Sequence, residues 1–512
     1  MNLAVLLAAL SASSIRGSID REITGIVAHS NDVRPGALFV AIPGFAHDGH
    51  AFVPEAVTRG ASAIVVERPV EVPPQVTRVQ VPDSRLALAL LSSVYYGHPS
   101  RELHLIGVTG TNGKGTTAYL IEAMFSRAGL PCGIIGTMGA TLTGETVNLD
   151  RTTPEAPELQ RLLRRMVEAG LRHAVMEVAS HALALHRVAG CQFTAAVFTN
   201  LTQDHLDFHK TFEDYRAAKR RLFEMVSPDG VAVVNVDDPS AQVMAAATRA
   251  RVFTYGIEGP ADVRAQELRL HLGGADFVVL TPAGHRHVAS HLHGRFNVYN
   301  ALAAIAVAQS QGVVLDVMAA ALAEFPGVPG RFEPIDEGQP FAVVVDYAHT
   351  PDGLENVLKT ARDFVHGRTI VVFGCGGDRD RTKRPVMGQI ASRLADVAIV
   401  TSDNPRSEQP EAIIEDIMAG IREQGTGNRE QRPEARGPRS EARVEVEPDR
   451  RRAIARAIEL AHPGDLVLIA GKGHESYQEV HGIKHPFDDR LVAREALRYY
   501  RASGLGPRRG HE

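Results

Sequence analysis

The feature of this sequence that most restricts its fold is the stretch GVTGTNGKGTTA at residues 107–118. A short apolar segment before it predicts a strand, and Ile121, Met124 and Phe125 after it recur at helical spacing. A glycine-rich turn between a strand and a helix directs backbone N–H groups at phosphate, and Lys114 adds a positive charge. The stretch therefore predicts a phosphate-binding loop inside an α/β domain.

The residue after Lys114 is Gly115, whereas the usual phosphate loop has a Ser or Thr there, whose hydroxyl binds Mg²⁺. Thr116 and Thr117 follow directly, at the expected start of the helix. We therefore expect the metal-binding hydroxyl to have moved one residue along, to Thr116, with Thr117 as the alternative.

Acidic and imidazole side chains follow two other apolar segments. Glu177 ends the segment HAVME, and Asp204, His205 and His209 lie in TNLTQDHLDFH, just after another strand candidate. A carboxylate and an imidazole beside a phosphate loop are suited to the cation that neutralises a triphosphate. The two histidines also suggest zinc, but no third ligand stands at a diagnostic spacing, and each alone is equally a solvent-facing loop residue.

Length and composition set outer limits on the protein. The chain has 512 residues, which is too long for one hydrophobic core and predicts about three domains. Its net charge of −5 gives no reason to expect nucleic acid as a partner. The three cysteines are far apart and lack metal-ligand spacing, and no apolar run approaches roughly 20 residues. We therefore expect a cytoplasmic protein without a membrane span.

The first residues, MNLAVLLAALSAS, form an apolar segment with two interpretations. Leu3, Leu6, Leu7 and Leu10 fall on one face of a helix, and no basic residue precedes Arg16. A signal peptide has a basic region at its start. The pattern therefore favours an amphipathic first helix over a signal peptide.

The apolar segments predict three α/β domains, at residues 1–100, 101–329 and 330–512. In the first, GALFVAIPG and ASAIVVE are strand candidates around a helical stretch at FVPEAVTRG, and YYGHPSREL is a linker to the second domain. The second alternates short apolar strands with helices, as in a doubly wound parallel sheet. The third contains a charged segment near 423–447, which we expect to be a mobile insertion.

The third domain has four strand candidates, FAVVVDYAH, TIVVFGCGG, VAIVTSDNP and DLVLIAGKG, and each ends in polar or glycine residues. Ligands of open α/β sheets bind at the carboxyl ends of the strands. We therefore expect one crevice to contain Asp346, Asp378, Arg379, Asp403, Arg406, Lys472 and Glu475.

The chain resembles the Mur ligase family through segments that run nearly from end to end in the family's order: GTNGKGTT, TNLTQDHLDFH, YRAAKRRLF, GRFNVYN, PGRFE, VDYAHTPDGL, GCGGDRDRTKRPVMG, DNPR and GKGHE. The resemblance implies a UDP-binding N-terminal domain, a central P-loop ATPase-like domain and a Rossmann-like C-terminal domain. It also implies a monomeric enzyme of bacterial cell-wall synthesis. ATP would phosphorylate the D-glutamate γ-carboxylate of UDP-N-acetylmuramoyl-L-alanyl-D-glutamate, and the amine of an amino acid would attack the acyl phosphate.

The resemblance also assigns roles to residues. Lys114, Glu177, His205 and Lys219 would be catalytic, with a metal bound by Thr116, Glu177, His205 and a carbamylated Lys219. The ATP contacts would be Gly110, Thr111, Asn112, Gly113, Lys114, Gly115, Thr116, Thr117, Asn297, Arg331 and Asp346. Contacts to the UDP-muramoyl dipeptide would be Ser30, Thr152, Thr153, Ser180 and Arg187. The incoming amino acid would contact Arg379, Asp403, Asn404, Pro405, Arg406, Gly471 and Glu475.

The segment DNPR implies which amino acid is added. In the family it accompanies meso-diaminopimelate, whose distal carboxylate suits the fork of Arg406. Lysine has no such carboxylate and would leave the guanidinium without a partner.

Three departures from the family pattern leave alternatives open. Gly115 matches folylpolyglutamate synthase, a relative with the same acyl-phosphate chemistry, and Ala179 and Asn31 replace a Ser and an Arg that contact substrate. The alternatives are L-lysine as the added amino acid, a folylpolyglutamate-synthase-like ligase, or an inactive nucleotide-binding scaffold. The presence of Lys114 and Lys219 argues against the scaffold.

Overall fold

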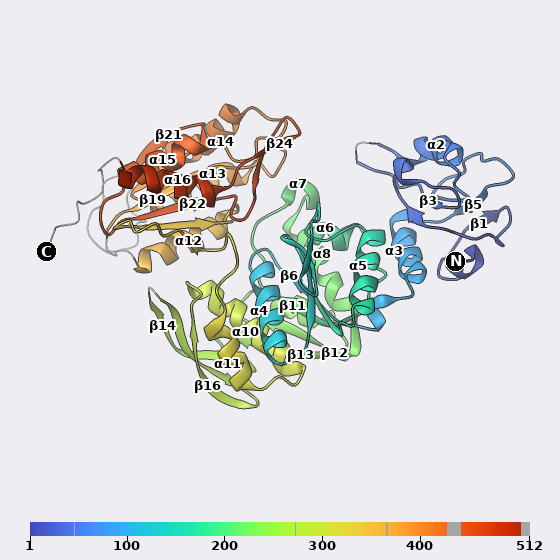
Figure 1. Cartoon of the computed structure of the whole chain (residues 1–512), viewed down its shortest axis with the longest axis horizontal. Helices are drawn as coiled ribbons and strands as arrows, with labels where there is room; N and C mark the ends of the chain where they lie inside the picture. The colour runs from blue at the N-terminus through green and yellow to red at the C-terminus, as the bar shows by residue number, and fades with distance from the viewer. Residues whose placement is uncertain (46, 272, 365–366, 427–441, 503–512) are drawn as a thin grey trace.

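The computed structural model describes residues 1–45, 47–271, 273–364, 367–426 and 442–502. Three large β-sheets follow one another along the chain, and Figure 1 shows each in its own body, with the central one joining the other two. Within these described ranges, no helix combines the length and the apolar character that crossing a membrane requires. The three α/β bodies agree with the expected fold class.

The first sheet has the order β1-β5-β4-β3-β2 and is parallel except for β1. Leu3, Leu6 and Leu7 are buried against it, which confirms the amphipathic first helix, although that helix ends before Leu10. The elements are α1 (Leu3–Leu7), β1 (Ser14–Arg16), β2 (Ile26–Val27), η1 (Ser30–Asp32), β3 (Leu38–Val40), η2 (Gly49–Phe52), α2 (Val53–Thr58), β4 (Ala63–Val66), β5 (Thr77–Gln80) and α3 (Ser84–Tyr95).

The connection to the central body is short and held in place. After α3, a single turn η3 (Pro99–Arg101) leads into the first central strand. Arg164 donates hydrogen bonds to the carbonyl oxygens of Tyr96 (2.8 Å) and Gly97 (3.1 Å). The predicted linker is therefore anchored to the central body.

The central sheet has eleven strands in the order β16-β15-β14-β13-β12-β11-β6-β10-β7-β8-β9. The strands from β13 to β7 are parallel, and two apolar clusters cover the two faces. Its strands are β6 (His104–Thr109), β7 (Cys132–Gly136), β8 (Gly139–Leu142), β9 (Glu145–Val147), β10 (His173–Glu177), β11 (Phe193–Phe198), β12 (Val226–Asn235), β13 (Arg251–Gly256), β14 (Val263–His271), β15 (Gly274–Thr281) and β16 (Gly284–Ser290).

The central helices are α4 (Lys114–Arg127), α5 (Ala156–Glu168), α6 (Ser180–Ala184), α7 (Leu206–His209), α8 (Phe212–Glu224), α9 (Ala241–Ala245), α10 (Arg295–Ser310) and α11 (Leu315–Glu324). The strands predicted before the phosphate loop, at HAVME and before TNLTQDHLDFH are confirmed by β6, β10 and β11, and the helix predicted after the loop is confirmed by α4. The doubly wound arrangement brings the carboxyl ends of β6, β10 and β11 together, because these parallel strands are neighbours.

The third sheet has the order β17-β18-β22-β19-β20-β21 and is parallel except for β17. Its elements confirm all four strands expected there. They are β17 (Glu333–Pro334), β18 (Ala342–Asp346), α12 (Pro351–Phe364), β19 (Thr369–Phe373), α13 (Lys383–Leu394), β20 (Val397–Val400), α14 (Pro410–Thr426), β21 (Arg443–Val446), α15 (Arg450–Leu460), β22 (Leu466–Ala470) and α16 (Asp489–Ala502), with a separate hairpin β23 (Tyr477–Val480) and β24 (Ile483–Pro486).

The expectation of a mobile insertion at 423–447 is wrong at both ends. Residues 423–426 continue helix α14, and residues 443–446 form β21, the edge strand that pairs with β20. The Arg456 guanidinium donates to Glu445 (3.0 Å), so the charged residues of β21 belong to the packed sheet. The remaining part of the predicted insertion, residues 427–441, lies outside the described residues.

Candidate active site

A cleft of about 1020 Å³ lies between the central and C-terminal bodies. It brings together most of the residues singled out from the sequence, which come from all along these two bodies. Those that line it are Thr111, Asn112, Gly113, Lys114, Gly115, Thr152, Thr153, Glu177, Ser180, Arg187, His205, Lys219, Arg331, Arg379, Asp403, Asn404, Arg406, Gly471 and Glu475.

The phosphate loop has the predicted place between β6 and α4. Gly113 precedes the helix with φ +84°, and a Cβ there would lie 2.3 Å from Asn300 Oδ1, so this position requires glycine. The Lys114 ammonium folds back onto the loop and donates to the carbonyl oxygens of Gly110 (3.0 Å) and Thr111 (2.7 Å). A glycine-rich turn at a helix N-terminus of this kind suits a phosphate group, in line with the prediction from the sequence.

Two lysines meet at this loop. Lys219, on α8, is 1% exposed, donates to the Gly110 carbonyl (2.7 Å) and lies over the Tyr215 ring (4.5 Å). Burial, together with repulsion by Lys114, lowers the pKa of Lys219 well below its usual value. Burial also lowers the pKa of Lys114. The site therefore favours an uncharged amine at Lys219.

Glu177 and His205 suit a divalent cation. Glu177 Oε1 accepts from the Thr137 N–H (2.7 Å), and its carboxylate faces the cleft at the end of β10. Burial lowers the pKa of His205 well below its usual value, which leaves the neutral imidazole that metal binding requires. A carboxylate with a neutral imidazole is a fitting donor set, although the described residues contain no preformed cluster of three such ligands.

The structure does not bring the expected replacement hydroxyl to the cleft. Thr116 is 5% exposed, Thr117 is fully buried beside Asn300 (3.4 Å from Oγ1 to Oδ1), and neither lines the cleft. Gly115 does line it, and a Cβ there would lie 3.4 Å from Glu177 Oε1. Thr116 and Thr117 therefore lie behind the surface of the cleft in this structure, and the metal-binding role of Thr116 stays a prediction.

The other ATP contacts expected from the resemblance are only partly at the cleft. Arg331 lines it, with its guanidinium 4.5 Å from the centre of the Tyr347 ring. Asp346 is buried beneath and accepts from the N–H groups of Phe332 (2.6 Å) and Ala348 (2.7 Å). Asp346 shapes the chain around Arg331 and does not line the cleft, and its expected contact with ATP stays a prediction.

Asn297 likewise lies behind the phosphate loop. Its Oδ1 accepts from Asn300 Nδ2 (3.0 Å), and Asn300 is the residue that touches Gly113 and Thr117. The sequence analysis missed Asn300, although its spacing of three residues from Asn297 places both on one face of α10.

Thr153 and Arg187, which are expected to bind the muramoyl peptide, are connected to Glu177 by hydrogen bonds. The Thr153 hydroxyl donates to the Glu177 carbonyl (2.9 Å), and Arg187 Nη1 donates to the Thr153 carbonyl (3.2 Å). Ser180 contacts His209 (2.9 Å). Ser30 lies elsewhere, in the N-terminal body, where its hydroxyl donates to Glu55 (2.9 Å), so the structure does not bring it to this cleft.

The guanidinium groups of Arg379 and Arg406 line the side of the cleft that the C-terminal body contributes. We call this side the guanidinium wall. Arg406 has φ +52° and donates from Nη1 to the Gly377 carbonyl (2.6 Å), with Glu479 3.5 Å from its Nε. Arg379 lies close by, because a Cβ at Gly376 would lie 2.9 Å from Arg406 Nη1 and 3.8 Å from Arg379 Cγ. Burial and then repulsion by Arg406 lower the pKa of Arg379. Two adjacent cations at a partly buried wall are suited to bind carboxylates.

A buried polar network supports the residues of this wall. Lys472 is fully buried and donates to Asn404 Oδ1 (2.9 Å) and Glu475 Oε2 (3.1 Å), and Asn404 Nδ2 donates to the same carboxylate (2.8 Å). Gly471 has φ +121°, and a Cβ there would lie 2.5 Å from Asp403 Oδ2. Pro405 does not line the cleft, but it fixes the turn between Asn404 and Arg406.

Contacts across the cleft join the two bodies. Asn112 Nδ2, in the phosphate loop, donates to Asp352 Oδ2 on α12 (2.8 Å), and Lys383 Nζ lies 4.0 Å from Asp204 Oδ1. Asn112 and Asp204 were singled out from the sequence, but their partners Asp352 and Lys383 were not, because no pattern within one segment reports a partner in another body.

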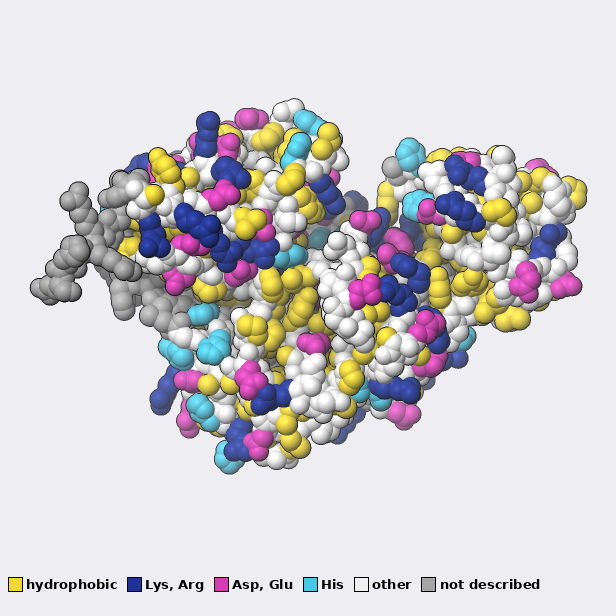
Figure 2. Space-filling view, in the orientation of Figure 1, with side chains coloured by type: hydrophobic (Ala, Val, Ile, Leu, Met, Phe, Trp, Pro, Cys, Tyr) yellow, Lys and Arg dark blue, Asp and Glu magenta, His cyan; other side chains and the backbone are white. Residues whose placement is uncertain are grey.

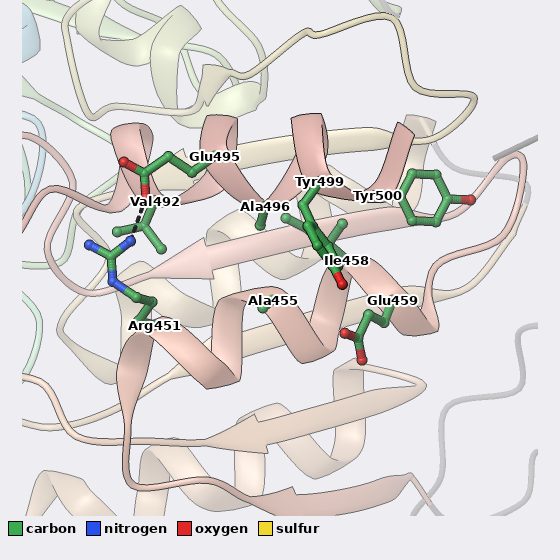
Figure 3. Close-up of a pocket in the computed structure, with 9 residues that line it drawn as sticks. All are labelled: Arg451, Ala455, Ile458, Glu459, Val492, Glu495, Ala496, Tyr499 and Tyr500. Atoms are coloured by element: carbon green, nitrogen blue, oxygen red, sulfur yellow. Dashed lines mark hydrogen bonds and ion pairs between the residues drawn. The ribbon is translucent and has the colours of Figure 1, made fainter. Parts of the chain in front are cut away.

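A second, smaller hollow of about 170 Å³ lies between α15 and α16 (Figure 3). Ile458 and Tyr499 extend into the space between the helices, and Arg451 forms an ion pair with Glu495 at one end. None of the residues predicted to be functional lines this hollow.

Comparison with known proteins identifies the family to which the chain is similar. Family models of the Mur ligases match residues 22–96 (catalytic domain), 108–308 (middle domain) and 330–473 (glutamate ligase domain). The chain belongs to the Mur ligase family. The three matched ranges follow the three sheets, and the predicted recognition of the family is confirmed.

Named relatives resemble the whole chain. The UDP-N-acetylmuramoyl-L-alanyl-D-glutamate–2,6-diaminopimelate ligase of Geobacillus thermodenitrificans is 48% identical over 97% of this chain and 99% of its own length. A solved ligase of the same name is 35% identical, with TM-score 0.65 over 94% of this chain and 95% of its own. Folylpolyglutamate synthase of Mycobacterium tuberculosis is 18% identical, with TM-score 0.61 over 81% of this chain and 94% of its own, and shares the fold alone.

Proposed function

We propose that this chain is an ATP-dependent ligase that joins meso-2,6-diaminopimelate to the D-glutamate γ-carboxylate of UDP-N-acetylmuramoyl-L-alanyl-D-glutamate. The observation that carries the proposal is the cleft, which holds a phosphate loop on one side and two guanidinium groups on the other. Its full-length relatives bear the name of this activity. The reaction belongs to peptidoglycan precursor synthesis, and we place it in the cytoplasm, carried out by a monomer.

The chemistry follows from the groups in the cleft. A carboxylate resists attack by an amine because its oxide is a poor leaving group, and transfer of the γ-phosphoryl group of ATP supplies a good one. The backbone N–H groups of the phosphate loop and the Lys114 ammonium stabilise the charge that develops during this transfer. The amine then attacks the acyl carbon, and phosphate leaves.

Glu177 and His205 would hold Mg²⁺, which when bound neutralises phosphate charge. Lys219 would join them as a carbamate. An uncharged amine reacts with CO₂, and the burial that lowers the Lys219 pKa provides that form. The product is a carboxylate-like oxygen ligand, which suits Mg²⁺ where an ammonium group does not.

Arg406 would select diaminopimelate. Its Nε and one Nη1 proton already have partners in Glu479 and Gly377, which leaves the Nη2 side of the fork for a ligand carboxylate. Lysine has no carboxylate at its distal end and would leave a desolvated guanidinium without its ligand, which disfavours it.

The test is phosphate release by the purified protein with ATP, Mg²⁺ and the UDP-muramoyl dipeptide, with meso-diaminopimelate, L-lysine or no amino acid added. Turnover with diaminopimelate alone is expected. Turnover with lysine instead would contradict the role of Arg406 while leaving a ligase. Turnover only with a folate substrate would favour the relative that shares Gly115, and no turnover with any substrate would favour the scaffold.

A further inference from the structure

The segment from Arg379 to Lys383 spans the two sides of the cleft. Arg379 belongs to the guanidinium wall. Four residues later, Lys383 Nζ lies 4.0 Å from Asp204 Oδ1, and between them the Thr382 hydroxyl accepts from Gln203 Nε2 (3.2 Å). This short segment therefore leads from the wall that would bind the amino acid to the loop that contains His205.

Asp380, within this segment, has an oxygen with no partner. Its side chain lines the cleft and the residue is 5% exposed. Oδ1 accepts from the Thr382 N–H (2.9 Å) and hydroxyl (2.6 Å), whereas Oδ2 has no hydrogen-bond partner in the part of the chain described. A buried carboxylate oxygen without a donor is unfavourable, so a ligand that brings a donor would be bound strongly.

Asp403 is the other carboxylate of this kind. Among the residues described, the buried carboxylate oxygens without a hydrogen bond are Asp380 Oδ2 and Asp403 Oδ2, and both residues line the cleft. Asp403 Oδ2 has the Arg450 guanidinium 3.9 Å away, whereas Asp380 Oδ2 has no such ion pair among these residues. Each lies close in sequence to one of the two guanidinium groups, Asp380 next to Arg379 and Asp403 three residues before Arg406. The cleft thus offers two cation–anion pairs, and diaminopimelate carries an ammonium and a carboxylate at each end.

We infer that Asp380 binds the ammonium group at the reacting end of the amino acid and removes its proton as the amine attacks. The inference rests on the proposed function. It assigns the reacting end to Arg379 and Asp380 because their segment contacts the loop with His205, whereas Asp403 and Arg406 take the distal end.

The step is balanced in protons and charge. The ammonium loses one proton to Asp380 Oδ2, and its nitrogen lone pair forms the bond to the acyl carbon. The carbonyl π pair moves to oxygen and returns as the C–O bond to phosphate breaks. The nitrogen loses its second proton to the departing phosphate, so the products are the amide, hydrogen phosphate and protonated Asp380.

The experiment compares two nucleophiles with the full-length Asp380→Asn variant, which keeps Oδ1 as an acceptor for Thr382. Hydroxylamine is mostly uncharged at neutral pH and traps an acyl phosphate without help from a base. We expect ligation of diaminopimelate to fall about 100-fold, the usual scale for a lost general base. Hydroxamate formation from ATP, the UDP-muramoyl dipeptide and hydroxylamine is expected to stay within about threefold of wild type.

Thr382→Val is the matched control, because it removes the hydroxyl that binds Asp380 Oδ1 without removing the carboxylate. It should keep hydroxamate formation and lose much less of the ligation rate than Asp380→Asn, whereas a purely structural role of Asp380 predicts that the two variants lose both reactions alike. The defect of Asp380→Asn should also shrink as the pH rises and more amine is uncharged.

Loss of both reactions in Asp380→Asn, or retention of both, would overturn the inference. A wild-type protein that makes no hydroxamate would instead overturn the proposed ligase, so the two failures are distinguishable.

Discussion

At the scale of single residues, Lys114 links the phosphate loop to the proposed phosphoryl transfer. Its ammonium now satisfies the carbonyl oxygens of Gly110 and Thr111, and it would turn to phosphate when ATP binds. Lys114→Ala should lower phosphate release at least about 100-fold, because one preorganised electrostatic contact to the transferred group is lost.

Lys359→Ala is the control for that change, since Lys359 is exposed on α12 and forms an ion pair with Glu355 (2.9 Å). It should leave turnover unchanged. Near-normal turnover of the Lys114 variant would show that the loop does not act on phosphate.

A second prediction for a single residue concerns the effect of replacing Lys219. Lys219→Ala should be severely impaired, by about 100-fold or more, because the carbamate oxygen ligand is lost. Short carboxylates such as acetate should restore part of the rate by entering the space that the side chain leaves. Phosphate release with and without acetate measures this, and wild-type activity of the variant would exclude the carbamate.

At the scale of elements, the wall with Arg379 and Arg406 depends on two loops that hold each other. Arg384 at the start of α13 is fully buried and binds both oxygens of Glu408 (2.7 and 2.9 Å), and Glu408 also accepts from the Asp378 N–H (2.7 Å). The loop after β19 and the loop after β20 are thereby fixed to each other, which sets the spacing of the two guanidinium groups.

Glu408→Gln should destabilise these loops by about 2 kcal/mol, the scale of a hydrogen bond to a charged group, and raise the KM for diaminopimelate more than that for ATP. The Arg384 guanidinium lowers the pKa of Glu408 from 4.5 to about 2. Because Glu408 has a lower pKa in the folded than in the unfolded protein, its ionised form stabilises the fold at pH values above 4.5. This stabilisation is lost as the pH falls from 4.5 toward 2 and Glu408 becomes protonated.

Thermal melting from pH 6 down to pH 2 measures the effect. The difference in Tm between wild type and Glu408→Gln should be largest above pH 5 and should shrink as the pH falls. A constant difference across this range would contradict the ion pair as its cause.

The elements also show what sequence alone could predict. Strands such as Val397–Val400 are continuous apolar runs that end in polar residues, so both their existence and their functional ends were predictable. The hairpins β14–β16 were missed because their exposed strands mix charged and apolar residues. The burial of Thr116 was not predictable, because the direction of its side chain depends on the helix geometry and not on its residue type.

At the scale of the whole molecule, the contact between Asn112 and Asp352 holds the phosphate loop to the C-terminal body. Asp352→Ala should loosen the arrangement of the two bodies without unfolding either, because the sheets do not depend on this side chain. Small-angle X-ray scattering of the ligand-free protein should show a larger radius of gyration than wild type.

Glu355→Ala, on the same helix but paired with Lys359 and Arg393, should leave the scattering unchanged. Equal radii for Asp352→Ala and wild type would mean that other contacts across the cleft set the arrangement. Such contacts could not be predicted from sequence, because they depend on how two separately folded bodies meet.

Ser30 and the cleft lie in different bodies, and the surface is hollowed between the N-terminal and C-terminal bodies (Figure 2). If Ser30 contacts the UDP end of the substrate, as the family resemblance implies, the reacting carboxylate must reach the cleft from a fixed starting point. The distance between Ser30 and the cleft would then determine which length of substrate can react. A peptide stem one residue shorter or longer would present its carboxylate at the wrong place, and the order in which a growing peptide is built would be set by length.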